Sequence, residues 1–214
     1  MAPKEDRRVK LRDSRLLLVT DPRPDLAARV AATVRGGVDI VQLRDKRASR
    51  EELLLLAEEL RDICARADVI FTINDDPELA RLSRAAGVHL GQEDGPIASA
   101  RRILGPDAIV GRSASTVEEA REAVDEGADY LGIGTIFATP TKTDTEVAGL
   151  KLLEDISRED LPVPWFAIGG VTLETASQIA AAGAPGFAVV RAILDAEDPE
   201  AAARELRALL PDSN

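Results

Sequence analysis

Eight short apolar runs alternate along the 214-residue chain with longer segments in which apolar residues recur at helical spacing. Short apolar runs bounded by glycine, proline or charged residues are typical of buried β-strands. The eight runs cover residues 15–20, 38–43, 69–73, 88–90, 109–111, 130–134, 165–168 and 186–190. The helical segments cover residues 25–35, 49–66, 77–86, 96–104, 116–126, 149–156, 173–182 and 199–210.

This alternation predicts an α/β fold, and eight regular βα units predict a (β/α)8 TIM barrel. An open doubly wound sheet is the alternative, although such sheets rarely contain eight units of this regularity. No change in composition marks a second domain, so we expect residues 1–214 to form a single barrel domain. Residues 1–13 are charged and lack the apolar core of a signal peptide, so we expect a flexible polar leader there.

Composition limits the partners that the chain can have. The net charge is −11 and the sequence has no basic stripe, which argues against nucleic acid as a partner. No apolar run approaches the length that crosses a membrane. The single cysteine, Cys64, excludes an intramolecular disulfide and fits a reducing compartment, so we expect a cytoplasmic protein in which Cys64 is a core residue.

One polar cluster follows the second apolar run and precedes a helical segment. It consists of Gln42, Leu43, Arg44, Asp45 and Lys46. Positions 42, 44 and 46 share strand parity, so their side chains should project to one side. An amide and two cations on one side suit a polyanionic ligand such as a pyrophosphate ester. A solvated charged loop is the alternative, but further polar clusters after other strands favour a ligand site.

Carboxylates follow the third and fourth runs, at Asp75 and Asp94. In a TIM barrel the active site lies at the C-terminal ends of the strands, so these two side chains should be neighbours. Mg²⁺ is commonly held by one or two carboxylates together with phosphate oxygens of the substrate. The alternative is that the aspartates cap the helix that begins at Pro77, and we assign that role to Asp76. The sequence therefore predicts Mg²⁺ at Asp75 and Asp94.

Glycines and hydroxyl residues follow the later strands. Gly169 and Gly170 allow a ligand to approach the backbone, and the loops after strands 7 and 8 are the usual phosphate site of this fold. Other strand ends carry Asn74, Arg112, Ser113 and Arg191, and the sixth run is followed by Thr139, Pro140, Thr141 and Lys142. His89 lies between two apolar residues, so we expect a packed, structural histidine. The absence of a histidine or cysteine cluster argues against a zinc site.

These clusters, in this order, resemble the thiamine-phosphate synthase family over residues 16–194. The resemblance is carried by residues 41–46, 73–76, 87–94, 128–134, 139–142 and 167–171. Members of the family are transferases that join 4-amino-2-methyl-5-(diphosphooxymethyl)pyrimidine to a thiazole phosphate, giving thiamine phosphate and pyrophosphate. The resemblance implies this activity in thiamine diphosphate biosynthesis, with Mg²⁺ as cofactor, small-molecule substrates and a homo-oligomeric protein.

The resemblance also implies roles for individual residues. The pyrimidine diphosphate would lie against Gln42, Leu43, Arg44, Asp45, Lys46, Asn74, Ser113 and Lys142, with Mg²⁺ at Asp75 and Asp94. The thiazole phosphate would lie against Thr139, Pro140, Thr141, Gly170, Val190 and Arg191. Catalytic roles would fall to Arg44, Ser113 and Lys142. The chain departs from the family in two places: Arg191 stands where serine is usual, and Ser115 stands where a histidine often follows Ser113.

The residues suit a reaction in which pyrophosphate leaves first and the thiazole nitrogen captures the resulting pyrimidine cation. Such a reaction needs stabilisation of the leaving group and positioning of the acceptor, and it needs no protein nucleophile. Two alternatives remain: a thiazole tautomerase on a similar barrel, and a catalytically silent barrel that binds a phosphate ester. The cations argue against the first alternative, and the paired carboxylates argue against both.

Overall fold

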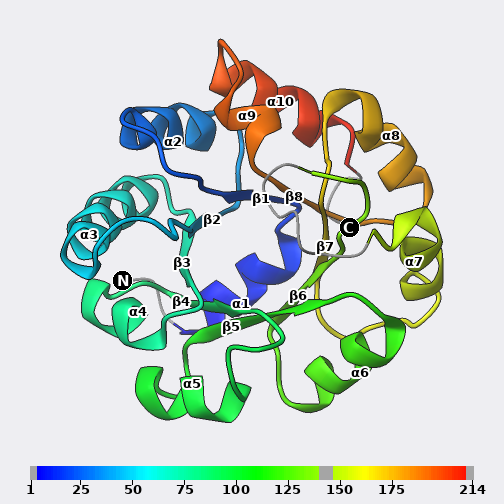
Figure 1. Ribbon diagram of the computed structural model, residues 1–214, viewed down its shortest axis with the longest axis horizontal. Coiled ribbons are helices and arrows are strands. Elements are labelled where there is room, and N and C mark those ends of the chain that lie inside the picture. The colour runs from blue at the N-terminus through cyan, green and yellow to red at the C-terminus, as the bar shows by residue number, and fades with distance from the viewer. Residues whose placement is uncertain (1–3, 140–146, 211–214) are drawn as a thin grey trace.

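Eight parallel strands close into a barrel in the computed structural model, which describes residues 4–139 and 147–210 (Figure 1). The strands are β1 (Leu16–Val19), β2 (Ile40–Leu43), β3 (Ile70–Asn74), β4 (Gly87–Leu90), β5 (Ile109–Ala114), β6 (Tyr130–Ile133), β7 (Trp165–Ile168) and β8 (Phe187–Val189). Each strand pairs with the next along the chain, and β8 returns to β1 with Ala188 opposite Leu17. The predicted (β/α)8 barrel is therefore confirmed, and the open sheet is excluded.

Helices surround the barrel between successive strands (Figure 1). They are α2 (Leu26–Arg35), α3 (Arg50–Arg66), α4 (Pro77–Ser83), α5 (Ile97–Leu104), α6 (Val117–Asp125), α7 (Gly149–Ile156), α8 (Leu173–Ala181), α9 (Arg191–Leu194) and α10 (Pro199–Ala208). Side chains cap the N-termini of several of these helices. Ser49 and Glu52 form a capping box at α3, and the Asp76 carboxylate accepts the Leu79 N–H at 2.9 Å to cap α4, as expected. The short helix α9 was not predicted, because its four residues are too few for a periodic pattern.

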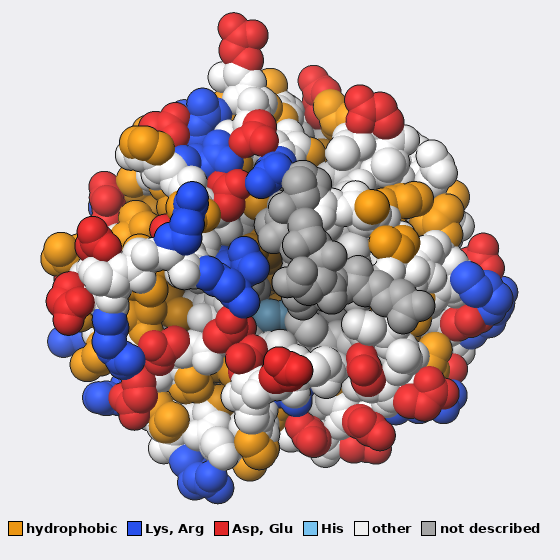
Figure 2. Space-filling model, in the orientation of Figure 1, with side chains coloured by type: hydrophobic (Ala, Val, Ile, Leu, Met, Phe, Trp, Pro, Cys, Tyr) orange, Lys and Arg blue, Asp and Glu red, His pale blue; other side chains and the backbone are white. Residues whose placement is uncertain are grey.

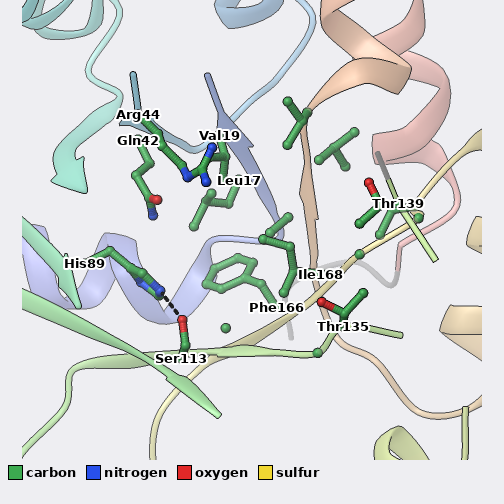
Figure 3. A pocket seen from close by; sticks show the side chains of 18 of the residues that line it. Leu17, Val19, Gln42, Arg44, His89, Ser113, Thr135, Thr139, Phe166 and Ile168 are labelled. Carbon is green, nitrogen blue, oxygen red and sulfur yellow. Dashed lines mark hydrogen bonds between the residues drawn. The ribbon is translucent and has the colours of Figure 1, made fainter. Parts of the chain in front are cut away.

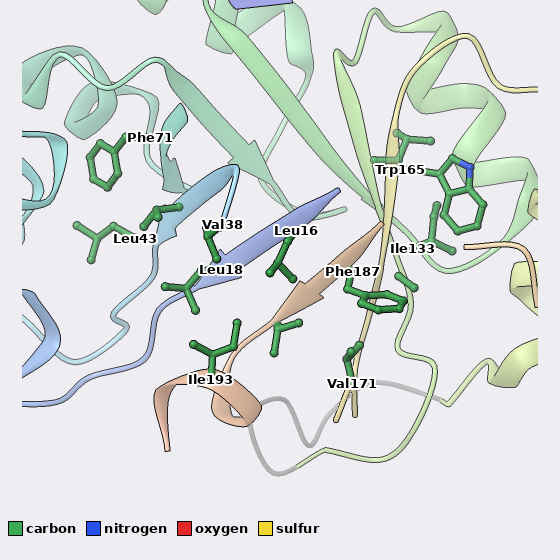
Figure 4. Packing of buried hydrophobic residues seen from close by; sticks show 14 of the residues in the cluster. Leu16, Leu18, Val38, Leu43, Phe71, Ile133, Trp165, Val171, Phe187 and Ile193 are labelled. Atoms are coloured by element: carbon green, nitrogen blue, oxygen red, sulfur yellow. The ribbon is translucent and has the colours of Figure 1, made fainter. Parts of the chain in front are cut away.

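Two apolar layers hold the fold together. Residues on the outer faces of the strands, including Leu18, Phe71 and Phe187, pack against the helices (Figure 4). Residues on the inner faces, including Ile40 and Ile109, fill the N-terminal half of the barrel. Since successive side chains of a strand point to opposite faces, one short run supplies both layers. The C-terminal half of the barrel is left for polar side chains.

Residues 4–13 differ from the expected flexible leader, because Lys4–Asp13 form helix α1. This helix crosses the N-terminal end of the barrel and lies behind its centre in Figure 1. Leu11 is buried in the inner apolar layer, and Lys10 and Arg8 pair with Asp68 at 2.5 Å and Asp129 at 2.9 Å. The sequence did not predict this helix, because the contacts that hold it involve one apolar residue and two aspartates that lie far along the chain.

None of the helices among the described residues combines the length and apolar character needed to cross a membrane.

Strand β5 is longer than predicted, because Arg112 and Ser113 belong to it and do not follow it. These two consecutive polar residues do not fit the pattern of a buried strand, so the sequence did not indicate that β5 continues through them. Their side chains point to opposite sides, so they have different roles in the structure.

Cys64 lies in the outer apolar layer, as expected, and burial raises the pKa of its thiol to about 12. The thiol stays protonated at pH 8, and the thiolate is the reactive form. We therefore expect native protein to resist iodoacetamide at pH 8 and to become labelled once guanidinium unfolds it. Mass spectrometry gives one unambiguous signal because the chain has a single cysteine. Rapid stoichiometric labelling of the native protein would contradict the buried position.

Candidate active site

A cavity of about 970 Å³ opens at the C-terminal end of the barrel. Figure 2 shows this face hollowed near its centre, with basic and acidic side chains gathered around the hollow. Side chains from β2, β3, β4 and β5 line one part of the cavity, and the ends of β7 and β8 line another. The barrel therefore brings together polar residues that are far apart in the sequence.

Alternate residues at the end of β2 point to opposite sides of the strand. Gln42, Arg44 and Lys46 line the cavity, and Figure 3 shows Gln42 and Arg44 extending toward its centre. Leu43 faces the outer apolar layer, and the Asp45 carboxylate accepts the N–H groups of Arg47 and Ala48 at 2.8 and 3.1 Å. The side chains of Leu43 and Asp45 thus shape the strand end and do not line the cavity.

Thr20 fixes the backbone of Arg44, a role that the sequence did not reveal. The buried Thr20 hydroxyl accepts the Arg44 N–H at 2.8 Å and lies 3.2 Å from the Arg44 carbonyl oxygen. Both hydrogen bonds tie the end of β1 to the end of β2. The guanidinium of Arg44 therefore extends from a backbone held on both sides.

The carboxylates of Asp75 and Asp94 meet at the rim of the cavity. The Asp75 N–H donates to the His89 carbonyl at 2.8 Å, and the Asp94 carboxylate accepts the Gly91 N–H at 2.7 Å. Burial and the neighbouring Asp94 raise the pKa of Asp75 to about 6, while Lys46 and Arg44 act in the opposite direction. The Lys46 ammonium lies 3.8 Å from the Asp75 carboxylate. Two carboxylates this close form a position that favours a cation.

The donor set at this position fits Mg²⁺ better than a transition metal. Within residues 4–139 and 147–210, no group of three or more histidine, cysteine or carboxylate side chains could hold a metal ion. A cation at Asp75 and Asp94 would therefore complete its shell with water or with ligand oxygens. Mg²⁺ binds in that way, whereas zinc sites use three or four protein ligands.

Arg112 holds the loop that carries Asp94. Its side chain is nearly buried outside the cavity, and its guanidinium donates to the Gly95 carbonyl at 2.7 Å and the Gln92 carbonyl at 3.3 Å. The polar residue at this strand end thus supports a neighbouring loop. Sequence position alone gave no signal for that contact.

Ser113 faces the cavity beside His89. The His89 Nε2 atom lies 3.0 Å from the Ser113 hydroxyl (Figure 3). The His89 Nδ1 atom lies 3.1 Å from the Tyr130 hydroxyl. His89 is buried, as expected, and it also borders the cavity. Tyr130 was not identified from the sequence, because it reads as one more apolar member of a strand.

The ends of β7 and β8 form the other part of the cavity. Gly169 and Gly170 have φ values of 100° and 65°, which favour glycine, and Val190 and Arg191 lie beside them. A methyl group at Gly170 would lie 2.6 Å from the Phe137 Cβ atom, so Gly170 also permits close packing of that loop. Arg191 extends near Asp21, with 3.7 Å between its Nε atom and the carboxylate.

Asn74 and Thr139 also line the cavity. Pro140, Thr141 and Lys142 lie outside the described residues, so their predicted roles stay predictions. The other predicted residues that line the cavity lie on two sides of it. One side carries cations and carboxylates, and the other is formed by glycines and backbone. Such an arrangement can hold two anionic ligands next to each other.

Comparisons with known proteins agree with this geometry. The family model described as thiamine monophosphate synthase matches residues 16–193. A thiamine-phosphate synthase of Synechocystis sp. is 44% identical over 197 residues, covering 92% of this chain and 57% of that protein. One from Methanocella arvoryzae is 45% identical over 188 residues, covering 87% of each. A solved thiamine phosphate pyrophosphorylase from Pyrococcus furiosus is 37% identical, with a TM-score of 0.84 over 94% of this chain and 96% of that one.

The match extends across the whole barrel. It begins at β1 and ends within α9, so it includes every strand and all the described residues that line the cavity. The chain spans somewhat more than half the length of several curated relatives that it matches, between 57% and 59% for two of them. On the family model and these identities, the chain belongs to the thiamine monophosphate synthase family.

Proposed function

We propose that the chain is a thiamine-phosphate synthase. It joins 4-amino-2-methyl-5-(diphosphooxymethyl)pyrimidine to a thiazole phosphate and releases pyrophosphate. The observation that carries this proposal is the pairing, in one cavity, of Arg44 and Lys46 with the carboxylates of Asp75 and Asp94. Cations beside a metal position suit a diphosphate leaving group, and family membership makes this diphosphate the expected one.

The leaving group determines the chemistry in this proposal. As the bond from the pyrimidine methylene carbon to the diphosphate oxygen breaks, negative charge grows on the diphosphate. Arg44 and Lys46 lie on the side where this charge develops, and Lys142 would join them by resemblance. Interactions that strengthen as charge develops lower the barrier, and no protein nucleophile is required.

Mg²⁺ is part of the proposal. Asp75 and Asp94 would hold it, and when bound it supplies positive charge to the diphosphate oxygens. The closeness of the two carboxylates supports this assignment, because their mutual repulsion favours a cation between them. Lys46 and Arg44 then neutralise the remaining charge of the ligand.

The acceptor would occupy the other part of the cavity. We propose that its phosphate lies against the backbone of Gly170, Val190 and Arg191, with Thr139 and Thr141 beside the thiazole ring. Gly170 lines the cavity without a side chain, and the Arg191 side chain adds a cation that replaces the serine usual in the family. The thiazole nitrogen would then face the pyrimidine methylene carbon as pyrophosphate leaves.

A single assay tests the proposal. Purified protein is incubated with Mg²⁺ and both substrates, and thiamine phosphate and pyrophosphate are quantified. We expect equimolar formation of the two products, and no reaction when either substrate is omitted. Isomerisation of the thiazole phosphate alone would indicate a tautomerase. Binding of the substrates without any product would indicate a silent phosphate-binding barrel.

Three further statements stay predictions of the sequence and its resemblance. They are a cytoplasmic location, assembly as a homo-oligomer, and a single domain for the whole chain. Sedimentation of the purified protein tests the second. The substrates named above account for the small-molecule partners that we expect.

A further inference from the structure

A row of interacting side chains crosses the barrel and lines the cavity. His89 and Tyr130 belong to β4 and β6, with Gly111 of β5 directly between them in the pairing register. Neighbouring strands lie about 4.8 Å apart, so the two backbones are separated by one strand and by two such spacings. Their side chains nevertheless meet, with 3.1 Å between the His89 Nδ1 atom and the Tyr130 hydroxyl.

Glycines create the space for this contact. A Cβ atom at Gly111 would overlap the Tyr130 ring and lie 2.6 Å from the His89 Nδ1 atom. A Cβ atom at Gly132 would lie 3.3 Å from His89 Cε1. The Tyr130 ring is fully buried and meets Phe166 edge to face at 5.8 Å. The pair is therefore built into the barrel interior, and its rings have little room to rotate.

The row has a cavity-lining residue at each end. On one side, the His89 Nε2 atom lies 3.0 Å from the Ser113 hydroxyl. On the other side, burial raises the pKa of the Tyr130 hydroxyl, while the neighbouring Thr72 and Gln42 side chains act in the opposite direction. Gln42 and Ser113 come from β2 and β5, and both are expected to contact the pyrimidine diphosphate.

We infer that Tyr130 is a positioning residue, which orients Ser113 through His89 and also orients the amide of Gln42. This inference rests on the proposed function, because it assigns both ends of the row to recognition of an aminopyrimidine. An aminopyrimidine presents an N–H donor beside a ring-nitrogen acceptor. A site that recognises it needs one acceptor and one donor in fixed directions.

The row supplies these directions. In this inference the Tyr130 hydroxyl donates to His89 Nδ1 across the 3.1 Å between them, and the neighbouring Gln42 amide turns its N–H toward the Tyr130 oxygen. His89 then carries its proton on Nε2 and donates to the Ser113 oxygen. The Ser113 O–H therefore points into the cavity toward the ring nitrogen, and the Gln42 carbonyl oxygen is left to accept from the exocyclic amine. Removing the Tyr130 hydroxyl breaks the row at its centre without emptying the space that the ring fills.

The test uses Tyr130→Phe and reads the histidine directly. His89 is the only histidine of the chain, so untagged protein labelled with ¹⁵N-histidine gives the signals of one imidazole. In wild type we expect one neutral tautomer with the proton on Nε2. In Tyr130→Phe we expect a mixture of tautomers, because Nδ1 has lost its donor. Identical spectra, or a proton on Nδ1 in wild type, would overturn the inference.

Kinetics provides the second measurement. Loss of one buried hydrogen bond is worth about 1 kcal/mol, so Tyr130→Phe should raise KM for the pyrimidine diphosphate roughly fivefold. KM for the thiazole phosphate should stay unchanged. Thr33→Val is the matched control: it removes a buried hydroxyl that donates to the Arg29 carbonyl at 2.7 Å on α2, away from the cavity. Equal effects of Tyr130→Phe on both KM values would indicate a merely structural role.

A double-mutant cycle separates action through Ser113 from independent effects. Tyr130→Phe combined with Ser113→Ala should cost less than the sum of the single changes, because both remove the same oriented hydroxyl. Additive losses would contradict the row. If wild type forms no thiamine phosphate, the proposed function fails while the ¹⁵N spectrum still decides on the row. If wild type is active and the spectra are identical, only the row fails.

Discussion

Replacing Asp94 by asparagine is expected to lower kcat/KM by roughly three orders of magnitude, because a metal ion supplies several kcal/mol to charge stabilisation. Asp75→Asn should have a similar effect, since both carboxylates meet at one position. Steady-state rates over a range of Mg²⁺ concentrations give the measurement. The control is Glu118→Gln, which removes an exposed carboxylate of α6 that does not line the cavity. Full activity of Asp94→Asn in chelator-treated buffer would refute the metal assignment.

Asp75→Asn should also raise the melting temperature in metal-free buffer at pH 7. The pKa of Asp75 is raised to about 6, so its ionisation is less favourable in the folded chain than in the unfolded one. The stability that the protonated group provides at low pH is therefore lost as pH rises through about 6. Asparagine stays neutral and escapes that loss. An inactive but more stable variant would show that unfolding does not explain the lost activity.

Arg44→Ala is expected to reduce kcat roughly 100-fold, the usual cost of removing one donor that faces developing charge. The loss in kcat should exceed the rise in KM for the pyrimidine diphosphate, because the charge on the leaving group grows as the bond breaks. Arg44→Lys should recover part of the rate, since it keeps the charge but loses the planar fork of donors.

Arg47→Ala is the matched control for Arg44, because Arg47 is exposed in the same turn and does not line the cavity. A variant at position 44 with unchanged kcat and only a raised KM would assign Arg44 to ground-state binding. Equal losses for the changes at positions 44 and 47 would indicate a general effect of surface charge.

Local patterns predicted the parts of the fold and site that depend on neighbours in sequence. Strand parity placed Gln42, Arg44 and Lys46 on one wall, and helix-start chemistry separated Asp76 from Asp75. Both inferences depend on geometry within a few residues, which the sequence specifies directly. The closing of the barrel followed from repetition of one unit.

Contacts between distant segments were not predictable in this way. Helix α1 is held by Asp68 and Asp129, and Arg112 is held by carbonyl groups of the loop before α5. Tyr130 reads as an apolar strand residue, yet its hydroxyl meets His89 because Gly111 leaves space between them. Each case requires knowing which strands are neighbours and which position lacks a side chain.

Helix α1 has a consequence for the order of events in turnover. It covers the N-terminal end of the barrel, with Leu11 packed into the inner layer, so ligands must pass through the loops at the opposite end. When a cavity opens at one end only, the ligand that binds deeper must bind first and dissociate last. With the pyrimidine on Gln42 and Ser113, we expect ordered addition in which the diphosphate substrate precedes the thiazole. Pyrophosphate, formed nearer the rim at Lys46 and Asp75, should then dissociate before thiamine phosphate, and it should act as a product inhibitor with a pattern distinct from that of thiamine phosphate.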